Sequence, residues 1–274
     1  MKAISALVLL VAGGFAYFQP MRWLIESWRV NPYYKHGVVV VLVSIAYAVF
    51  KIVRSEKAES QDHHWAYFLT ASIVLYLIGF QTGLIFLKTV PIFLTLLSIA
   101  YLLGDYLPAH SLRFPILFPI IVIPVPFLPE LTAFLQFFMA HLSTGILQVF
   151  GYEIVAEGAT IYLPNATFVI GEPSSGIQSL VALLTLMVPV VYFTKTSLKK
   201  KTLLYLMIVP VAMLGNLLRI VTLFLVGYYY GEAVAADFWH DIGGVLFYFS
   251  SLIFLFILWY LIVYGCRRTQ TNPA

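Results

Sequence analysis

Two adjacent serines, Ser174 and Ser175, stand in the stretch GEPSSGIQS, directly before a long apolar run. A serine that follows proline at the start of a helix is usually an N-cap, whose hydroxyl accepts a hydrogen bond from a backbone amide. The first amides of that helix, near Gly176 and Ile177, would also offer a positive dipole end to a reacting oxygen. The local residues therefore leave two interpretations open, a helix cap or a nucleophile.

Arg219 lies inside another apolar run, GNLLRIV. A charged side chain costs about 2.5–3.5 kcal/mol at the centre of a spanning helix, so its default interpretation is functional. Snorkelling of the side chain to the membrane surface is the alternative. Arg219 cannot act as a base, but its fixed positive charge could stabilise an oxyanion where water is scarce.

His240 opens a third apolar run, in FWHDIGG. An imidazole can take a proton from a nucleophile and return it to a leaving amine, because its ordinary pKa is near neutrality. Asp241 or Asp237 could orient this ring, and either could equally be a solvated acid. A hydroxyl at Ser174, the imidazole of His240 and a guanidinium together predict acyl transfer.

The composition predicts an integral membrane protein. The chain has 274 residues, of which 61% are hydrophobic and 10% charged, with a mean hydropathy of +0.93, far from the composition of a soluble domain. Since a spanning helix needs about 20 mostly apolar residues, we predict one all-α polytopic domain, residues 1–274, with eight spans. The spans are expected at residues 4–18, 37–53, 65–80, 84–104, 115–128, 175–193, 202–226 and 242–264.

The orientation follows from one short basic loop, because Lys and Arg accumulate on the cytoplasmic side. The loop is KTSLKKK, with Lys195, Lys199, Lys200 and Lys201. This frame places both termini in the cytoplasm and puts the loops 151–174 and 227–239, which lack Lys and Arg, outside the plasma membrane. Ser174 and His240 then lie at outer helix ends, and Arg219 lies roughly 26 Å along its helix from Thr202. The active site is expected at the extracytoplasmic face, although shared depth does not by itself make the three helices neighbours.

The segment 130–150 is apolar enough to be a ninth span, but that would put the loop 151–174 on the cytoplasmic side. Its polar residues recur at steps of four or multiples of four, as Thr132, Gln136, Thr144 and Gln148. One polar stripe predicts an amphipathic helix in the outer interface. The loop 151–174 then has strand-like stretches broken at Glu157-Gly158 and Pro164-Asn165, which predict a small extracytoplasmic hairpin.

The chain resembles the exosortases and archaeosortases, membrane transpeptidases that cut a C-terminal sorting signal and join the new carboxyl end to an acceptor. The resemblance is carried by ESWRVNPYYKHG, FPILFPIIVIPVPFLPEL, PSSGIQSL, GNLLRI and HDIGG. It implies a cysteine nucleophile at the position of Ser174, with Arg219 and His240 as the other catalytic residues. The residues that it implies in supporting positions are Ser175, Gly176, Gln178, Asn216, Asp241 and His36; no catalytic step is assigned to His36.

Serine at position 174 departs from the family pattern. A thiol is partly ionised at neutral pH and strongly nucleophilic, whereas a serine hydroxyl needs an effective base. We therefore expect an inactive or impaired Cys-to-Ser form that still binds substrate. It could be an engineered trap, a natural pseudoenzyme or a true serine enzyme, and the intact remainder of the motif favours the first.

The resemblance also implies the partners. These are secreted precursors with a C-terminal transmembrane sorting signal, and an amine-bearing acceptor, with lipid implied. We expect no cofactor and no metal, since none of the six histidines sits in a convincing ligand cluster. The net charge of +4 is attributed to orientation and anionic lipid contact, not to nucleic acid.

Two other functions remain as alternatives. In a rhomboid-like intramembrane serine protease, EPSSG would correspond to Gly-x-Ser-Gly with Ser175 as nucleophile, and WHDIGG to Ala-His-x-x-Gly. In a solute carrier or channel, Arg219, Lys88 and His240 would line a solute path. The rhomboid interpretation gives Arg219 no role, and a carrier has no need of an outer loop that ends at a nucleophile.

Overall fold

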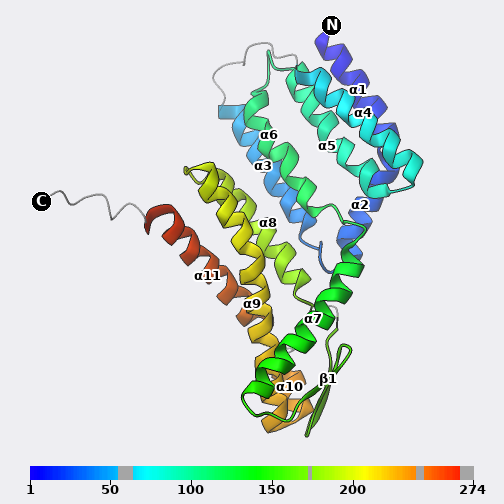
Figure 1. Ribbon diagram of the computed structural model, residues 1–274. Coiled ribbons are helices and arrows are strands. Elements are labelled where there is room, and N and C mark those ends of the chain that lie inside the picture. Colours follow the sequence, from blue (N-terminus) through cyan, green and yellow to red (C-terminus); the bar gives the residue numbers. More distant parts are fainter. Residues whose placement is uncertain (55–63, 172–174, 239–243, 266–274) are drawn as a thin grey trace, which may run out of the picture. The chain divides into compact units, whose positions relative to one another are not determined.

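The computed structural model describes residues 1–54, 64–171, 175–238 and 244–265 (Figure 1). Helices dominate, and one small antiparallel sheet accompanies them. The chain divides into two compact units, Met1–Pro126 and Phe127–Ala274. Each unit has its own packing and is described by itself.

The first unit is built around one enclosed helix, α5. Its elements are α1 (Lys2–Ala16), α2 (Phe18–Val30), α3 (Gly37–Arg54), α4 (His64–Thr82), α5 (Ile85–Leu102), α6 (Ala109–Leu117) and the 3-10 helix η1 (Phe118–Val122). In α5, 61% of the apolar window is buried, against 17% in α3 and 11% in α4. A helix that is apolar all round and enclosed by its neighbours is typical of a central position.

A buried polar cluster joins α1, α4 and α5. The hydroxyl of Tyr17 lies 2.9 Å from Ser72 Oγ and 2.8 Å from Thr95 Oγ1, and Ser72 Oγ also donates to the carbonyl of Pro91 at 3.0 Å. Tyr17 is the residue between α1 and α2, whose axes differ by 62°. Because buried hydroxyls must be hydrogen-bonded, this cluster fixes the position of the bend.

A second contact joins α2, α3 and η1. The indole nitrogen of Trp28 donates to the carbonyl of Val122 at 2.8 Å, and Gly37 packs against the indole face. A Cβ on Gly37 would lie 2.4 Å from Trp28 Cδ1, so no other residue fits here without displacing the ring.

The second unit contains two apolar clusters arranged along one long helix. Its elements are α7 (Leu128–Val149), β1 (Val155–Glu157), β2 (Thr160–Leu163), β3 (Ala166–Val169), α8 (Ile177–Phe193), α9 (Leu198–Tyr230), α10 (Glu232–Phe238) and α11 (Gly244–Tyr264). One cluster unites α8, α9 and α11, and the other unites α7, the sheet, α10 and the later part of α9. Figure 1 shows α9 running through both groups.

The sheet confirms and extends the predicted hairpin. Its order is β1-β2-β3, with Glu157 paired to Thr160 and Leu163 paired to Ala166. The chain therefore reverses at Gly158-Ala159, one residue later than the predicted break at Glu157-Gly158, and at Pro164-Asn165, as predicted. Gly158 has φ 64°, a left-handed conformation that favours glycine.

The prediction of eight spans is wrong in number. Among the residues that the structure describes, five helices are long and apolar enough to cross a membrane: α3, α4, α5, α9 and α11. The bent pair α1 and α2 could make a sixth. The helices Ala109–Val122 and Ile177–Phe193 are apolar but short, and the predicted span 115–128 fails because its helical part ends at Val122, before Pro124 and Pro126.

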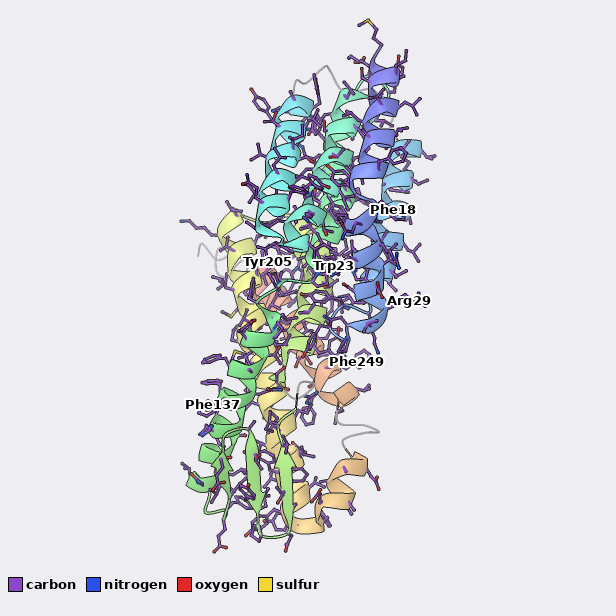
Figure 2. All side chains as sticks on the ribbon, turned by 90° about the vertical axis from the view of Figure 1, so that its right-hand side faces the viewer. Phe18, Trp23, Arg29, Phe137, Tyr205 and Phe249 are labelled. Carbon is purple, nitrogen blue, oxygen red and sulfur yellow. The ribbon has the colours of Figure 1, made fainter. Side chains whose placement is uncertain are left out.

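The polar stripe of α7 is only partly buried. Thr132 and Thr144 are buried, Gln136 is half-buried and Gln148 is exposed, whereas Phe134 and Phe137 are exposed. Figure 2 labels Phe137 on this helix. The helix is therefore amphipathic, with its two threonines packed inside its own unit and an exposed aromatic face. An interfacial position for residues 130–150 remains a prediction.

Replacing Gly37 tests the packing of the first unit. We expect Gly37→Ala to lower the free energy of unfolding by about 1–3 kcal/mol, because the new methyl group would displace Trp28 from a packed site. Thermal unfolding in detergent micelles measures the loss. Gly145→Ala is the matched control, because a Cβ there meets nothing within 4 Å; equal effects of the two changes would contradict the packing argument.

Candidate active site

Two polar side chains are buried side by side on α9. Asn216 is 3% exposed and Arg219 is 8% exposed. They lie between the two apolar clusters, since Val211 and Ala212 belong to the first cluster and Ile220 to the second. Three residues make one helical turn, so the amide and the guanidinium project from neighbouring positions. A buried cation at this point is therefore enclosed by apolar packing along the helix in both directions.

The start of α8 lies directly against this pair. Gly176 is the N-cap of α8 and has φ 84°. A Cβ on Gly176 would lie 3.0 Å from both Cγ and Nδ2 of Asn216. Glycine is required twice over, for its left-handed backbone and for the close approach. This contact brings the start of α8, from Ser175 onward, to the GNLLR motif.

Ser175 has a local structural partner. Its side chain is buried, and its Oγ accepts a hydrogen bond from the backbone amide of Ile177 at 3.3 Å. Because Gly176 is the N-cap and no side chain caps α8, this bond is a local serine turn and not the N-cap that the sequence allowed. Gln178, the second residue of α8, is exposed. The two supporting residues thus face different surroundings.

α11 approaches the same point of α9. A Cβ on Gly215 would lie 1.9 Å from Ser251 Oγ and 3.2 Å from Ser251 Cβ, so the two helices touch there. They run antiparallel, as the contact from Lys200 Nζ to the carbonyl of Val263 shows at the other end. Four residues further along α9 therefore correspond to four residues back along α11. By this register Arg219 lies level with the first turn of α11, which begins at Gly244.

The opposite ends of the three helices are tied together at the basic loop. Lys201 Nζ donates to the carbonyl of Tyr192 at 2.9 Å, and the indole nitrogen of Trp259 donates to Thr194 Oγ1 at 2.8 Å. From Lys201 to Arg219 the helix rises roughly 27 Å, compared with a bilayer hydrocarbon core of about 30 Å. The polar pair and the basic loop are thus separated by nearly one membrane thickness.

The sheet is fastened to the later part of α9. Gly227 packs against Phe168, where a Cβ would lie 2.5 Å from the ring, and Asn165 Nδ2 donates to the carbonyl of Tyr228 at 3.0 Å. The backbone amide of Ile170 donates to Ala159 at 2.8 Å, which ends the sheet just before the serine motif. The segment that leads into α8 is therefore held at a fixed level of α9.

Several predicted site residues lie elsewhere. Ser174, His240 and Asp241 are outside the described residues. Asp237 lies on α10 and is exposed. His36 belongs to the first unit, in the turn between α2 and α3, where burial lowers the pKa of its imidazole. Of the predicted residues, the structure brings Gly176, Ser175, Asn216 and Arg219 into one region of the second unit.

The sequence reasoning missed Gly215 and Ser251. Gly215 was visible as a glycine inside a helical run, which usually has a packing reason, but its partner on α11 could not be read from the sequence. Within the ranges that the structure describes, no group of three His, Cys, Asp or Glu residues could hold a metal ion.

One family model matches the chain. Its description is Transmembrane exosortase (Exosortase_EpsH), and the match covers residues 28–257. It runs through both compact units and includes both motifs that meet at Gly176 and Asn216. No curated protein and no solved structure matches the chain significantly.

The contact between Gly176 and Asn216 can be measured by a double-mutant cycle. We expect Gly176→Ala to cost about 2–4 kcal/mol, from a left-handed non-glycine residue and from overpacking. In the Asn216→Ala background the cost should be smaller, because the nearest atoms are gone. Gly158→Ala is the matched control, with φ 64° and open space. Additive effects in equilibrium unfolding would show that the contact is absent.

His36 should make stability depend on pH. Its pKa is lowered by burial in the folded state, so the unfolded chain binds more protons just below pH 6.5. The contribution of His36 is fully present above that pH and is lost as the pH falls through 6.5 towards the folded pKa. We expect His36→Gln to flatten the fall in melting temperature between pH 7 and pH 5. An unchanged pH profile would be the contrary result.

Proposed function

The chain belongs to the transmembrane exosortase family, whose members are membrane transpeptidases that process C-terminal sorting signals, and from this premise we propose its catalytic groups. Ser174 takes the place of the cysteine nucleophile, and Arg219 and His240 complete the site. The observation that carries the proposal is the packing of Gly176 against Asn216, one helical turn from Arg219. That contact supports a position for residue 174 close to the buried guanidinium.

The reaction follows from these groups. With cysteine at position 174, the thiolate attacks the scissile carbonyl carbon and the C–N bond breaks, leaving a thioester. His240 protonates the departing amine. An amine-bearing acceptor then attacks the thioester, His240 takes its proton, and the C–S bond breaks to release the thiolate as the new amide forms.

Arg219 has the electrostatic role. A guanidinium keeps its positive charge throughout the reaction and presents several N–H donors. The side chain is enclosed by apolar residues, where a fixed charge interacts with a developing oxyanion more strongly than in water. The first amides of α8, which follow Gly176, add a positive helix end to the same region.

We place the reaction at the extracytoplasmic face. The basic loop between α8 and α9 supports a cytoplasmic position for that end of the three helices. The termini are then also cytoplasmic, and the precursor's C-terminal helix would reach the site from the lipid. The acceptor would be the amine of a lipid headgroup.

Ser175 is an unsuitable nucleophile. Its hydroxyl is buried and accepts the Ile177 amide hydrogen bond, which argues for a structural role and against the rhomboid-like alternative. A solute carrier is also disfavoured, because Lys88 lies in the first turn of α5 with its ammonium 5.5 Å from the Phe80 ring, as expected for a residue near a helix end.

The residue at position 174 is the first test. We expect Ser174→Cys to process a membrane precursor bearing a C-terminal sorting signal, through a hydroxylamine-labile intermediate, while the serine form is nearly inactive. In the cysteine background, Arg219→Gln should reduce turnover about 10²–10³-fold, as for loss of an oxyanion donor. Product formation in membrane vesicles and mass spectrometry of the trapped intermediate are the measurements.

Ser175→Ala in the cysteine background is the control and should retain catalysis, with its loss confined to stability. Cleavage by the serine form that Ser175→Ala abolishes would contradict the assignment and favour a serine protease. Full turnover by Arg219→Gln would remove the proposed role of the guanidinium.

A further inference from the structure

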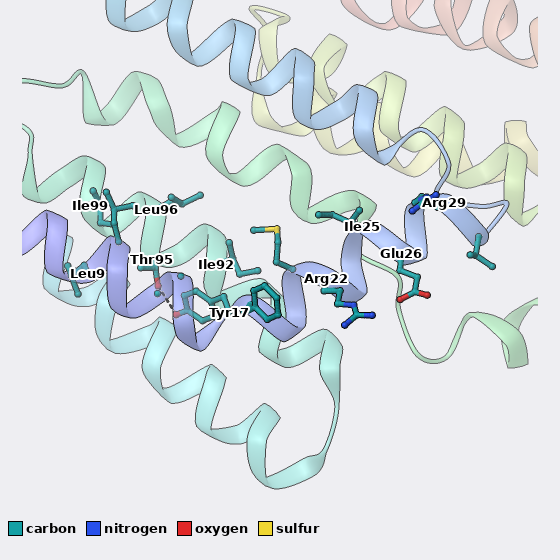
Figure 3. Close-up of a pocket in the computed structure, with 16 residues that line it drawn as sticks. Leu9, Tyr17, Arg22, Ile25, Glu26, Arg29, Ile92, Thr95, Leu96 and Ile99 are labelled. Carbon is teal, nitrogen blue, oxygen red and sulfur yellow. Dashed lines mark hydrogen bonds between the residues drawn. The ribbon is translucent and has the colours of Figure 1, made fainter.

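The first unit contains a large open groove that plays no part in the proposed active site. It has a volume of about 980 Å³ and is lined by α1, α2 and α5 (Figure 3). Its size is at the upper end of the range for small-molecule sites. The groove changes character along its length, from apolar walls beside α1 to charged walls beside α2.

The apolar part of the groove is widened by a missing side chain on α1. Leu9, Leu96 and Ile99 line its walls, and Gly13 and Gly14 line it from α1. A Cβ on Gly14 would meet no atom within 4 Å, so the space beside it is open. A linear hydrocarbon chain matches such a wall, which offers dispersion contacts and no hydrogen-bonding groups.

The charged part of the groove carries both signs. Arg22, Glu26 and Arg29 line it and are exposed. Figure 3 shows Arg22 and Glu26 on the same side of α2, with Arg29 near the end of the helix. Within the described part of the chain, neither arginine forms an ion pair within 4 Å of a carboxylate. Two positive charges and one negative charge are therefore available to a ligand.

The bend between α1 and α2 joins these two parts. α1 has no charged residue after Lys2, whereas α2 buries Pro20, Leu24 and Trp28 and exposes its charges. An amphipathic helix with cationic residues on its polar face is typical of the membrane interface. The angle of 62° at Tyr17 thus carries the groove from hydrocarbon depth to headgroup depth.

We propose that this groove binds one zwitterionic glycerophospholipid with a primary amine in its headgroup. An acyl chain lies along Leu9, Leu96 and Ile99, the phosphate accepts hydrogen bonds from Arg22 and Arg29, and Glu26 binds the ammonium. A phosphate and an ammonium match the arginine and carboxylate neighbours, whereas a purely anionic headgroup would meet Glu26. A primary ammonium also donates hydrogen bonds to a carboxylate, which a quaternary ammonium cannot do. The site does not depend on the proposed catalytic function.

The test is lipid binding by the full chain in detergent, followed by native mass spectrometry. The probes are phosphatidylethanolamine, phosphatidylcholine and phosphatidylglycerol with identical acyl chains. We expect phosphatidylethanolamine to bind best. Gly14→Leu, which fills the groove, should lower the affinity for this lipid at least about tenfold. Gly145→Leu on α7 is the matched control, since that glycine also faces open space, and it should bind normally.

The headgroup variants address the charges separately. The double variant Arg22→Gln with Arg29→Gln should lower the affinity for all three lipids, whereas Arg54→Gln, which lies outside the groove, should lower none of these affinities. Glu26→Gln should shift the preference towards phosphatidylglycerol. Because these side chains are exposed, the variants should keep the melting temperature. Unchanged lipid affinity in folded Gly14→Leu, or the same headgroup order in Glu26→Gln, would overturn the proposal. Displacement of lipid by a sorting-signal peptide would also overturn it, by assigning the groove to a polypeptide.

Discussion

The second unit depends on the close approach of two helices to α9 at a single level. Gly176 at the start of α8 contacts the amide of Asn216, and Gly215 beside it contacts Ser251 of α11. Both contacts require a missing side chain, because in a membrane protein there is little hydrophobic force between helices and association relies on close packing. The two glycines therefore fix the distance between the elements that carry the serine motif, the arginine and the first turn of α11.

This constraint also explains how a guanidinium can be kept inside the protein. Burying a charge is costly unless polar groups surround it. The polar stretch of α9 is short, running from Gly215 to Arg219. Apolar clusters pack on α9 on both sides of this stretch. The cost of enclosing Arg219 is thus limited to one layer, and the remaining turns of α9 pack as ordinary apolar surface.

Some of these features could be predicted from the sequence and others could not. The motifs around Ser174, Arg219 and His240 identified the family, and Glu157-Gly158 and Pro164-Asn165 marked the turns of the sheet. Hydropathy overestimated the number of spans, because an apolar run such as 115–128 does not reveal that its prolines end the helix early. The sequence showed the polar stripe of α7, but which of its residues are buried depends on which face the neighbouring elements cover. Partners across helices, such as Ser251 for Gly215, leave no mark in a single sequence.

The length of α9 has a mechanical consequence. Its 33 residues extend roughly 50 Å, well beyond a hydrocarbon core of about 30 Å, and the sheet and α10 pack on the excess. A continuous helix of this kind fixes a distance, because the number of helical turns between the buried polar layer and the sheet sets how far apart they lie. In the proposed mechanism, a substrate whose apolar anchor is longer or shorter than the matching distance would present the wrong peptide bond at that layer.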